Sequence, residues 1–174
     1  MKFGPANQIT LVRAVLVAGL AIPVGQPATP TVAWSVVIIA TVAALLDGVD
    51  GWVARRTGTV SEFGTRFDME TDAALILVLA ILVSQYGKAG PWVLLSGLLR
   101  YIFVAAGWLW PWMRAPLGSS LRAKIICVVQ TVALIVAIAP TVTLPASFVV
   151  AAAALLALSY SFLVDTLRLW WGTQ

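Results

Sequence analysis

Residues 47–72 read DGVDGWVARRTGTVSEFGTRFDMETD and interrupt an otherwise apolar chain. This stretch holds six of the seven acidic residues among 174, including Asp47, Asp50, Asp68 and Asp72. An aspartate at mid-membrane costs about 2.5–3.5 kcal/mol on insertion scales. Four aspartates in such a chain therefore need a compensating cation, and a divalent metal is the simplest one. A metal held by carboxylates near a membrane surface indicates phosphate chemistry.

The composition predicts an integral membrane protein. Hydrophobic residues make up 61% of the chain and charged residues 10%, whereas soluble domains average about 45–50% and about 25%. Histidine is absent, so a metal must be held mostly by oxygen ligands, and a carboxylate is the first choice for a general base. The net charge of +4 rests on too few basic residues to predict a nucleic-acid partner.

Six apolar segments are separated by turns rich in proline and glycine, and each is close to the roughly 20 residues that cross a bilayer. We expect an all-α membrane protein, with six transmembrane helices in one bundle and a single transmembrane domain over residues 1–174. The expected helices cover about residues 9–24, 31–54, 64–86, 91–110, 120–139 and 144–170.

The basic residues predict the orientation of this bundle. Only Lys88 falls in a loop on one side, and most of the others fall on the side of the two termini. Positive charge favours the cytoplasmic side of a membrane. Both termini and the four aspartates are therefore expected at the cytoplasmic face of the cell (inner or plasma) membrane.

The aspartate spacing predicts one shared site. Asp47 and Asp50 lie at i,i+3 and Asp68 and Asp72 at i,i+4, so each pair occupies one helix face. A short connection makes the two helices antiparallel neighbours, and two carboxylates can then face two across a cleft. This arrangement suits one or two hard divalent cations that bridge phosphate oxygens.

The residues beside the aspartates suit a phosphorylated ligand. Gly51, Ala54 and Gly64 are small, so a nucleotide or diphosphate could approach the backbone, and Arg55 could clamp phosphate. The alternative is that the aspartates cap helix ends or pair with nearby arginines. Asp47 and Asp50 lie near a helix C-terminus, where the helix dipole disfavours them, so capping does not explain that pair.

The order Asp47-x2-Asp50-Gly51-x2-Ala54-Arg55-x8-Gly64-x3-Asp68-x3-Asp72 resembles the full signature of the CDP-alcohol phosphotransferases. The signature covers 26 residues, and the six-helix layout extends the likeness over the chain. Eight fixed positions at the right spacing make the resemblance specific.

The resemblance implies the site and the chemistry. Asp47, Asp50 and Asp68 would bind the metals, two ions of Mg²⁺ or Mn²⁺, and Asp72 would complete the site and act as general base. The residues that would hold the CDP moiety are Gly51, Ala54, Arg55 and Gly64. The expected reaction is transfer of a phosphatidyl group from CDP-diacylglycerol to the hydroxyl of a polar acceptor, with release of CMP. The resemblance also implies a homodimer.

Asn7, Thr10 and Arg13 recur at three-residue spacing before the first expected helix. Their spacing is similar to the N-x-x-T-x-x-R run of family members that use glycerophosphate. This face could close over the nucleotide or diphosphate, with Thr10 as a CDP-binding residue. A helix start with an arginine reaching toward the membrane surface remains an equal alternative.

Arg100 lies near the middle of an expected helix, where an arginine needs an anionic partner or a water-filled cavity. With Arg114, Arg122 and Lys124 it could form a basic pocket for the phosphate of the acceptor. The alternative for those three is ordinary cytoplasmic positive charge.

The acceptor stays open at this point. Members that use glycerol 3-phosphate often read D-P-x-x-D-K from the third aspartate, whereas this chain has Met69 and Ala73 at the proline and lysine positions. The basic residues favour a phosphorylated acceptor, such as glycerol 3-phosphate or an inositol phosphate. The alternatives are transfer from a soluble CDP-alcohol to diacylglycerol, a small cation transporter, and a catalytically silent assembly subunit.

Overall fold

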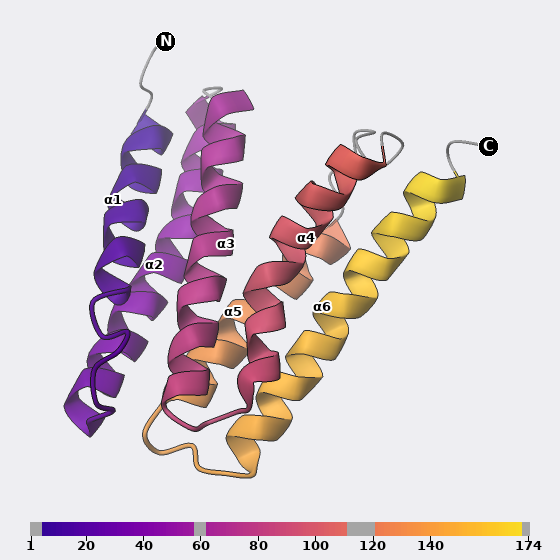
Figure 1. The fold of residues 1–174 in the computed structure, drawn as a ribbon. Helices are drawn as coiled ribbons and strands as arrows, with labels where there is room; N and C mark the ends of the chain where they lie inside the picture. Colours follow the sequence, from indigo (N-terminus) through magenta and orange to yellow (C-terminus); the bar gives the residue numbers. More distant parts are fainter. Residues whose placement is uncertain (1–4, 58–61, 111–120, 172–174) are drawn as a thin grey trace.

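The fold, seen in a computed structural model, is a bundle of helices, and the structure describes residues 5–57, 62–110 and 121–171 (Figure 1). The elements in chain order are α1 (Pro5–Leu20), α2 (Pro30–Thr57), α3 (Glu62–Gln85), the 3-10 helix η1 (Pro91–Leu94), α4 (Leu95–Leu109), α5 (Leu121–Ile138) and α6 (Ala146–Trp171). The described ranges contain no strand. The all-α prediction is confirmed.

Within the described residues, four segments are long and apolar enough to cross a membrane: Pro30–Val49, Pro91–Leu109, Leu121–Ile138 and Ala146–Trp171. The apolar part of α1 is shorter, Gln8–Leu20. Helix α3 has 24 residues, but Asp68, Glu70 and Asp72 interrupt its apolar stretch. The helical segments are thus confirmed, and within the described residues length and composition identify four candidate membrane spans.

The predicted start and end of the first helix are wrong. Helix α1 begins at Pro5, a residue favoured in the first helical turn, and ends at Leu20, before the turn that contains Pro23. The run from Asn7 to Arg13 lies wholly inside the helix, which begins four residues before the expected start at residue 9. Thr10 and Arg13 are buried, because this face of α1 is turned toward its neighbours. The bounds of the other helices differ from the prediction by at most three residues.

Helix α1 packs against both α2 and α3, and α5 packs against α2, α3 and α6. Small residues on α2, Ala33, Ala40 and Ala43, are buried and let the backbones approach closely. On the other helices the core is built from large aliphatic side chains such as Leu79 and Leu134, neither of which is exposed. The start of α1 and the end of α6 lie at the same end of the bundle (Figure 1).

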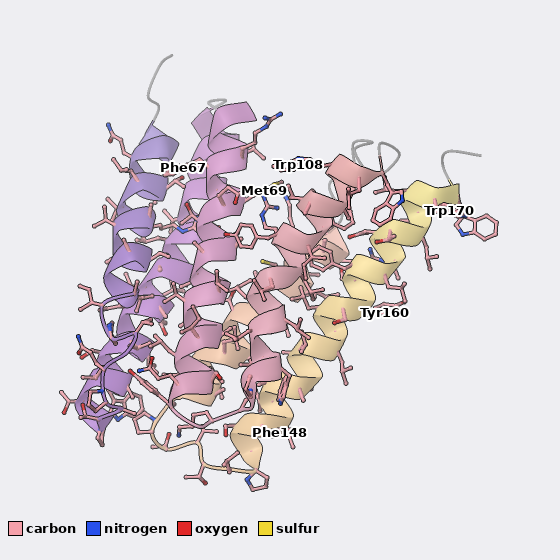
Figure 2. All side chains as sticks on the ribbon, in the orientation of Figure 1. Phe67, Met69, Trp108, Phe148, Tyr160 and Trp170 are labelled. Carbon is pink, nitrogen blue, oxygen red and sulfur yellow. The ribbon has the colours of Figure 1, made fainter. Side chains whose placement is uncertain are left out.

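Apolar side chains also cover the outside, as expected for a protein in contact with lipid. Ile38, Leu45 and Leu156 are exposed on α2 and α6. Aromatic side chains gather at the ends of the bundle: Trp108 and Trp170 lie at the end of the termini and Phe148 at the opposite end (Figure 2). Aromatic residues at both ends of an apolar band are typical of the two membrane–water interfaces.

Lys88 forms hydrogen bonds that link two connections at the end of the bundle opposite the termini. Its Nζ donates to the carbonyl oxygens of Ala139 (3.2 Å) and Val142 (2.5 Å) in the turn after α5. The buried hydroxyl of Ser147 donates to the carbonyl of Lys88 at 2.7 Å. These bonds join the α3–η1 connection to the α5–α6 connection, and they explain the one lysine on this side of the bundle.

We expect Lys88→Met to lower the free energy of unfolding by about 2–3 kcal/mol, because each hydrogen bond from a charged donor contributes about 1.5–3 kcal/mol. The measurement is denaturant unfolding in detergent micelles, followed by helical circular dichroism. Lys124→Met is the control, because Lys124 is exposed and should change the value by about 0.5 kcal/mol or less. Equal effects of the two substitutions would contradict this role of Lys88.

Candidate metal centre

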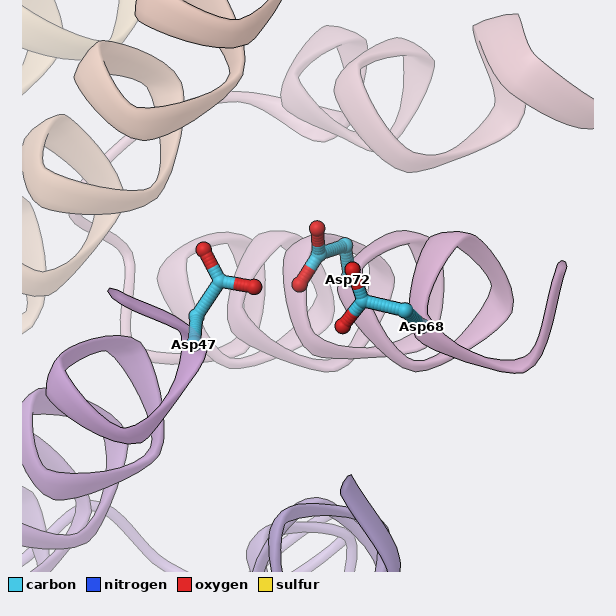
Figure 3. A group of neighbouring side chains, drawn as sticks. All are labelled: Asp47, Asp68 and Asp72. Atoms are coloured by element: carbon cyan, nitrogen blue, oxygen red, sulfur yellow. The ribbon is translucent and has the colours of Figure 1, made fainter. Parts of the chain in front are cut away.

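Three carboxylates converge in the half of the bundle that is nearer the termini. Asp47 comes from α2, and Asp68 and Asp72 come from successive turns of α3 (Figure 3). One oxygen from each carboxylate lies within 4.8 Å of the others. The side chains are half-buried, with exposed fractions of 31%, 36% and 28%. A hard divalent cation prefers oxygen ligands of this kind, so the residues fit the metal that the signature implies.

The guanidinium of Arg13 lies among these three carboxylates. Its Nη1 is 3.0 Å from Oδ1 of Asp47 and 2.5 Å from Oδ1 of Asp68, and its Nη2 pairs with Oδ1 of Asp72. The arginine side chain is 1% exposed. A buried arginine is tolerated only when it is paired, and these carboxylates supply the pairing. One positive charge against three negative ones leaves the group attractive to further cations.

The packing of α1 explains why Arg13 reaches this place. Thr10, Arg13, Val17 and Leu20 are all buried and form one face of α1 at helical spacing. Because α1 packs against both α2 and α3, this face points between the two helices that carry the aspartates. The sequence places Arg13 on a face that could close over the nucleotide or diphosphate, but its pairing with the aspartates was not predicted. Its three-residue spacing from Thr10 is the signal for this helix face.

The structure describes only part of the predicted CDP-binding set. Gly51 on α2 and Gly64 on α3 are half-buried, and Thr10 is 4% exposed. The side chains of Asn7, Asp50, Ala54 and Arg55, and the whole of Arg114, lie outside the described residues. Helix α2 continues to Thr57, so the i,i+3 relation between Asp47 and Asp50 holds along a regular helix.

Two arginines of the predicted acceptor pocket are found in ion pairs. Arg100 on α4 pairs with Glu70 of α3 at 2.5 Å, and Arg122 on α5 pairs with Asp165 of α6. Lys124 is exposed. The sequence instead suggests that Asp165 pairs with Arg168 on its own helix. The antiparallel contact of α5 with α6 brings Arg122 to Asp165.

The class of protein now follows from the comparison with known families. The family model described as CDP-alcohol phosphatidyltransferase matches residues 4–164. The chain therefore belongs to the CDP-alcohol phosphatidyltransferase family, and the resemblance drawn from residues 47–72 is confirmed. Membership also confirms the expected enzyme class.

The names of two relatives specify a particular donor and acceptor, which the family description does not. A Cereibacter sphaeroides protein named CDP-diacylglycerol--glycerol-3-phosphate 3-phosphatidyltransferase is 28% identical over 108 residues, which cover 60% of this chain and 49% of that protein. A protein of the same name from Escherichia coli (strain K12) is 33% identical over 147 residues, 80% of this chain and 76% of its own length. The chain thus spans about half of the first relative and three quarters of the second. No solved structure gives a significant match.

Proposed function

We propose that this protein transfers a phosphatidyl group from CDP-diacylglycerol to the hydroxyl of glycerol 3-phosphate and releases CMP. The observation that carries the proposal is the convergence of Asp47, Asp68 and Asp72 within 4.8 Å, in a chain of this family. The printed names of the relatives support glycerol 3-phosphate as the acceptor. Their names weigh more than the missing proline and lysine at Met69 and Ala73.

Asp47, Asp50, Asp68 and Asp72 would hold the divalent metal, Mg²⁺ or Mn²⁺. When bound, the metal neutralises diphosphate charge and so favours departure of CMP. Asp72 accepts the proton of the acceptor hydroxyl. The hydroxyl oxygen then forms a bond to the phosphorus that carries the diacylglycerol, and the bond from that phosphorus to the CMP oxygen breaks.

Two further groups of residues would contact the two substrates. Thr10, Gly51, Ala54, Arg55 and Gly64 would hold the CDP moiety. Arg100, Arg114, Arg122 and Lys124 would attract the phosphate of the acceptor, and Arg100 and Arg122 would then exchange their present carboxylate partners for that phosphate. Arginine suits this exchange because its planar fork binds carboxylate and phosphate in the same way.

The site belongs at the cytoplasmic face of the cell membrane in this proposal, with all six helices crossing or entering the bilayer. The start of α1 and the end of α6 at one end of the bundle support the even number of crossings. The basic residues near that end support the cytoplasmic side. The whole chain would form one catalytic domain, and a homodimer remains a prediction from the family.

The test is CMP release by purified protein with CDP-diacylglycerol, Mg²⁺ or Mn²⁺, and a panel of acceptors that includes glycerol 3-phosphate, glycerol, an inositol phosphate and serine. We expect release that depends on glycerol 3-phosphate and disappears in Asp72→Asn. Release with another acceptor would retain the reaction and replace the acceptor. Release only from a soluble CDP-alcohol with diacylglycerol would reverse the roles of donor and acceptor. If the purified protein bound neither CDP-nucleotides nor divalent metal, the proposed enzymatic function would be refuted, and a transporter or a silent subunit would be favoured.

A further inference from the structure

Arg13 contacts the same carboxylate group that would hold the metal. Its two terminal nitrogens contact Oδ1 of all three aspartates, and the ligand oxygens available to a cation come from these same side chains. The Arg13 side chain is 1% exposed. Water therefore does little to solvate its charge, and the carboxylates balance it instead. The contact is thus an internal pairing between α1 and the two aspartate-bearing helices.

A guanidinium and a divalent ion fit this space in different ways. The nitrogen–oxygen distances to Asp47 and Asp68 are 3.0 and 2.5 Å, whereas Mg²⁺ binds oxygen at about 2.0–2.1 Å. Metal coordination therefore requires the carboxylates to close around a smaller centre. The Arg13 guanidinium and a divalent ion bound to the same carboxylates would also repel each other strongly in a half-buried site.

The pairing with Asp72 points in the same direction. In the proposed reaction Asp72 receives a proton from the acceptor hydroxyl. The guanidinium takes one hydrogen-bonding position of the Asp72 carboxylate, and the second oxygen stays open to the hydroxyl. Arg13 therefore competes with the metal, and in part with the acceptor hydroxyl, for the oxygens of Asp72.

We infer that Arg13 is a built-in counter-cation, which holds Asp47, Asp68 and Asp72 together in the metal-free protein and is displaced by the divalent metal. Arg13 is in this sense a positioning residue that competes with the metal. The inference rests on the proposed metal site. It predicts that removal of this positive charge strengthens metal binding while it weakens the metal-free fold.

The experiment is Mn²⁺ titration of metal-stripped protein in detergent, with free Mn²⁺ followed by electron paramagnetic resonance. We expect Arg13→Gln to bind Mn²⁺ at least tenfold more tightly than wild type, and Arg13→Lys to stay within about threefold of wild type. Lys88→Gln is the matched control, because it also removes one hydrogen-bonding cation, here a half-buried one at the opposite end of the bundle. Its Mn²⁺ affinity should equal that of wild type.

A second readout is thermal unfolding. Without metal, Arg13→Gln should unfold at a lower temperature than wild type, because three carboxylates are left facing one another; added Mn²⁺ should raise its midpoint more than that of wild type. Should the variant fold only with metal, it can be purified in Mn²⁺ and its release to a chelator timed. Release at least tenfold slower than from wild type then supports the inference.

Equal or weaker Mn²⁺ binding by Arg13→Gln would overturn the inference and leave the metal site intact, since it would show that Arg13 supports the metal instead of competing with it. Absence of Mn²⁺ binding by wild type would have a different meaning: the proposed metal site itself would fail, and the inference with it. The wild-type titration therefore separates the two failures.

Discussion

Asp47→Asn should lower the rate of CMP release by more than about 100-fold, because even changes to residues that only support a metal ligand cost about 10–100-fold in affinity or activity. Asp47 is the one described carboxylate of the site that comes from α2, so the change removes the link across the two helices. Arg13 keeps its pairs with Asp68 and Asp72, and the fold should persist. The measurements are steady-state CMP release and Mn²⁺ affinity on the same preparation.

Glu70→Gln is the control for this substitution. Glu70 is a carboxylate on α3, two residues from Asp72, but it pairs with Arg100 and is 53% exposed. We expect Mn²⁺ affinity within about threefold of wild type. If Glu70→Gln weakened Mn²⁺ binding as much as Asp47→Asn, general negative charge near α3 would explain the binding, and the specific site would be refuted.

Gly97→Ala should lower the free energy of unfolding by about 2 kcal/mol. Gly97 on α4 is buried against α3, and a Cβ there would lie 2.5 Å from Cα of Leu77 and 2.7 Å from its Cβ. The nearest obstacle is backbone, so a side-chain rotation cannot relieve the overlap, and overpacking of this kind costs about 1–3 kcal/mol. Helix propensity favours alanine by about 1 kcal/mol, so the loss is a net figure. Unfolding in detergent measures it.

Gly19→Ala provides the matched control. Gly19 also lies within a helix, but no atom lies within 4 Å of the position that its Cβ would take. Alanine should therefore stabilise α1 by about 0.5–1 kcal/mol. Stabilisation by both substitutions would show that α3 and α4 can separate at Leu77 without loss, and it would contradict the close packing of α4 on α3.

The convergence of the three described aspartates can be predicted from local spacing, because the relation between Asp68 and Asp72 depends only on the period of a helix. The meeting of Asp47 with them follows from a short connection between two helices. Arg13 is different: the three-residue spacing from Thr10 puts it on a polar helix face, but its place among the aspartates depends on α1 packing against both α2 and α3. The same reason explains Asp165, whose partner Arg122 is 43 residues away in the sequence.

The bounds of α1 failed for a related reason. The expected start at residue 9 coincides with the first apolar residue after Asn7 and Gln8, although the first turn of a helix can carry polar residues. Proline at position 5 and the turn before Pro27 mark the true limits. The apolar segments 91–110, 120–139 and 144–170 were easier, because long and mostly hydrophobic runs of about 20 residues need no tertiary information.

The order of Arg13 and α3 along the chain bears on the biogenesis of the protein. Helix α3 carries Asp68, Glu70 and Asp72 in its first half, so its transfer alone from the translocation machinery into lipid would be expensive. Synthesis delivers α1 and α2 first, and the guanidinium is then already in place when α3 emerges from the ribosome. Helix α3 can therefore enter the bilayer with part of its negative charge offset by Arg13 of α1, so the ion pair would serve membrane insertion before any substrate is encountered.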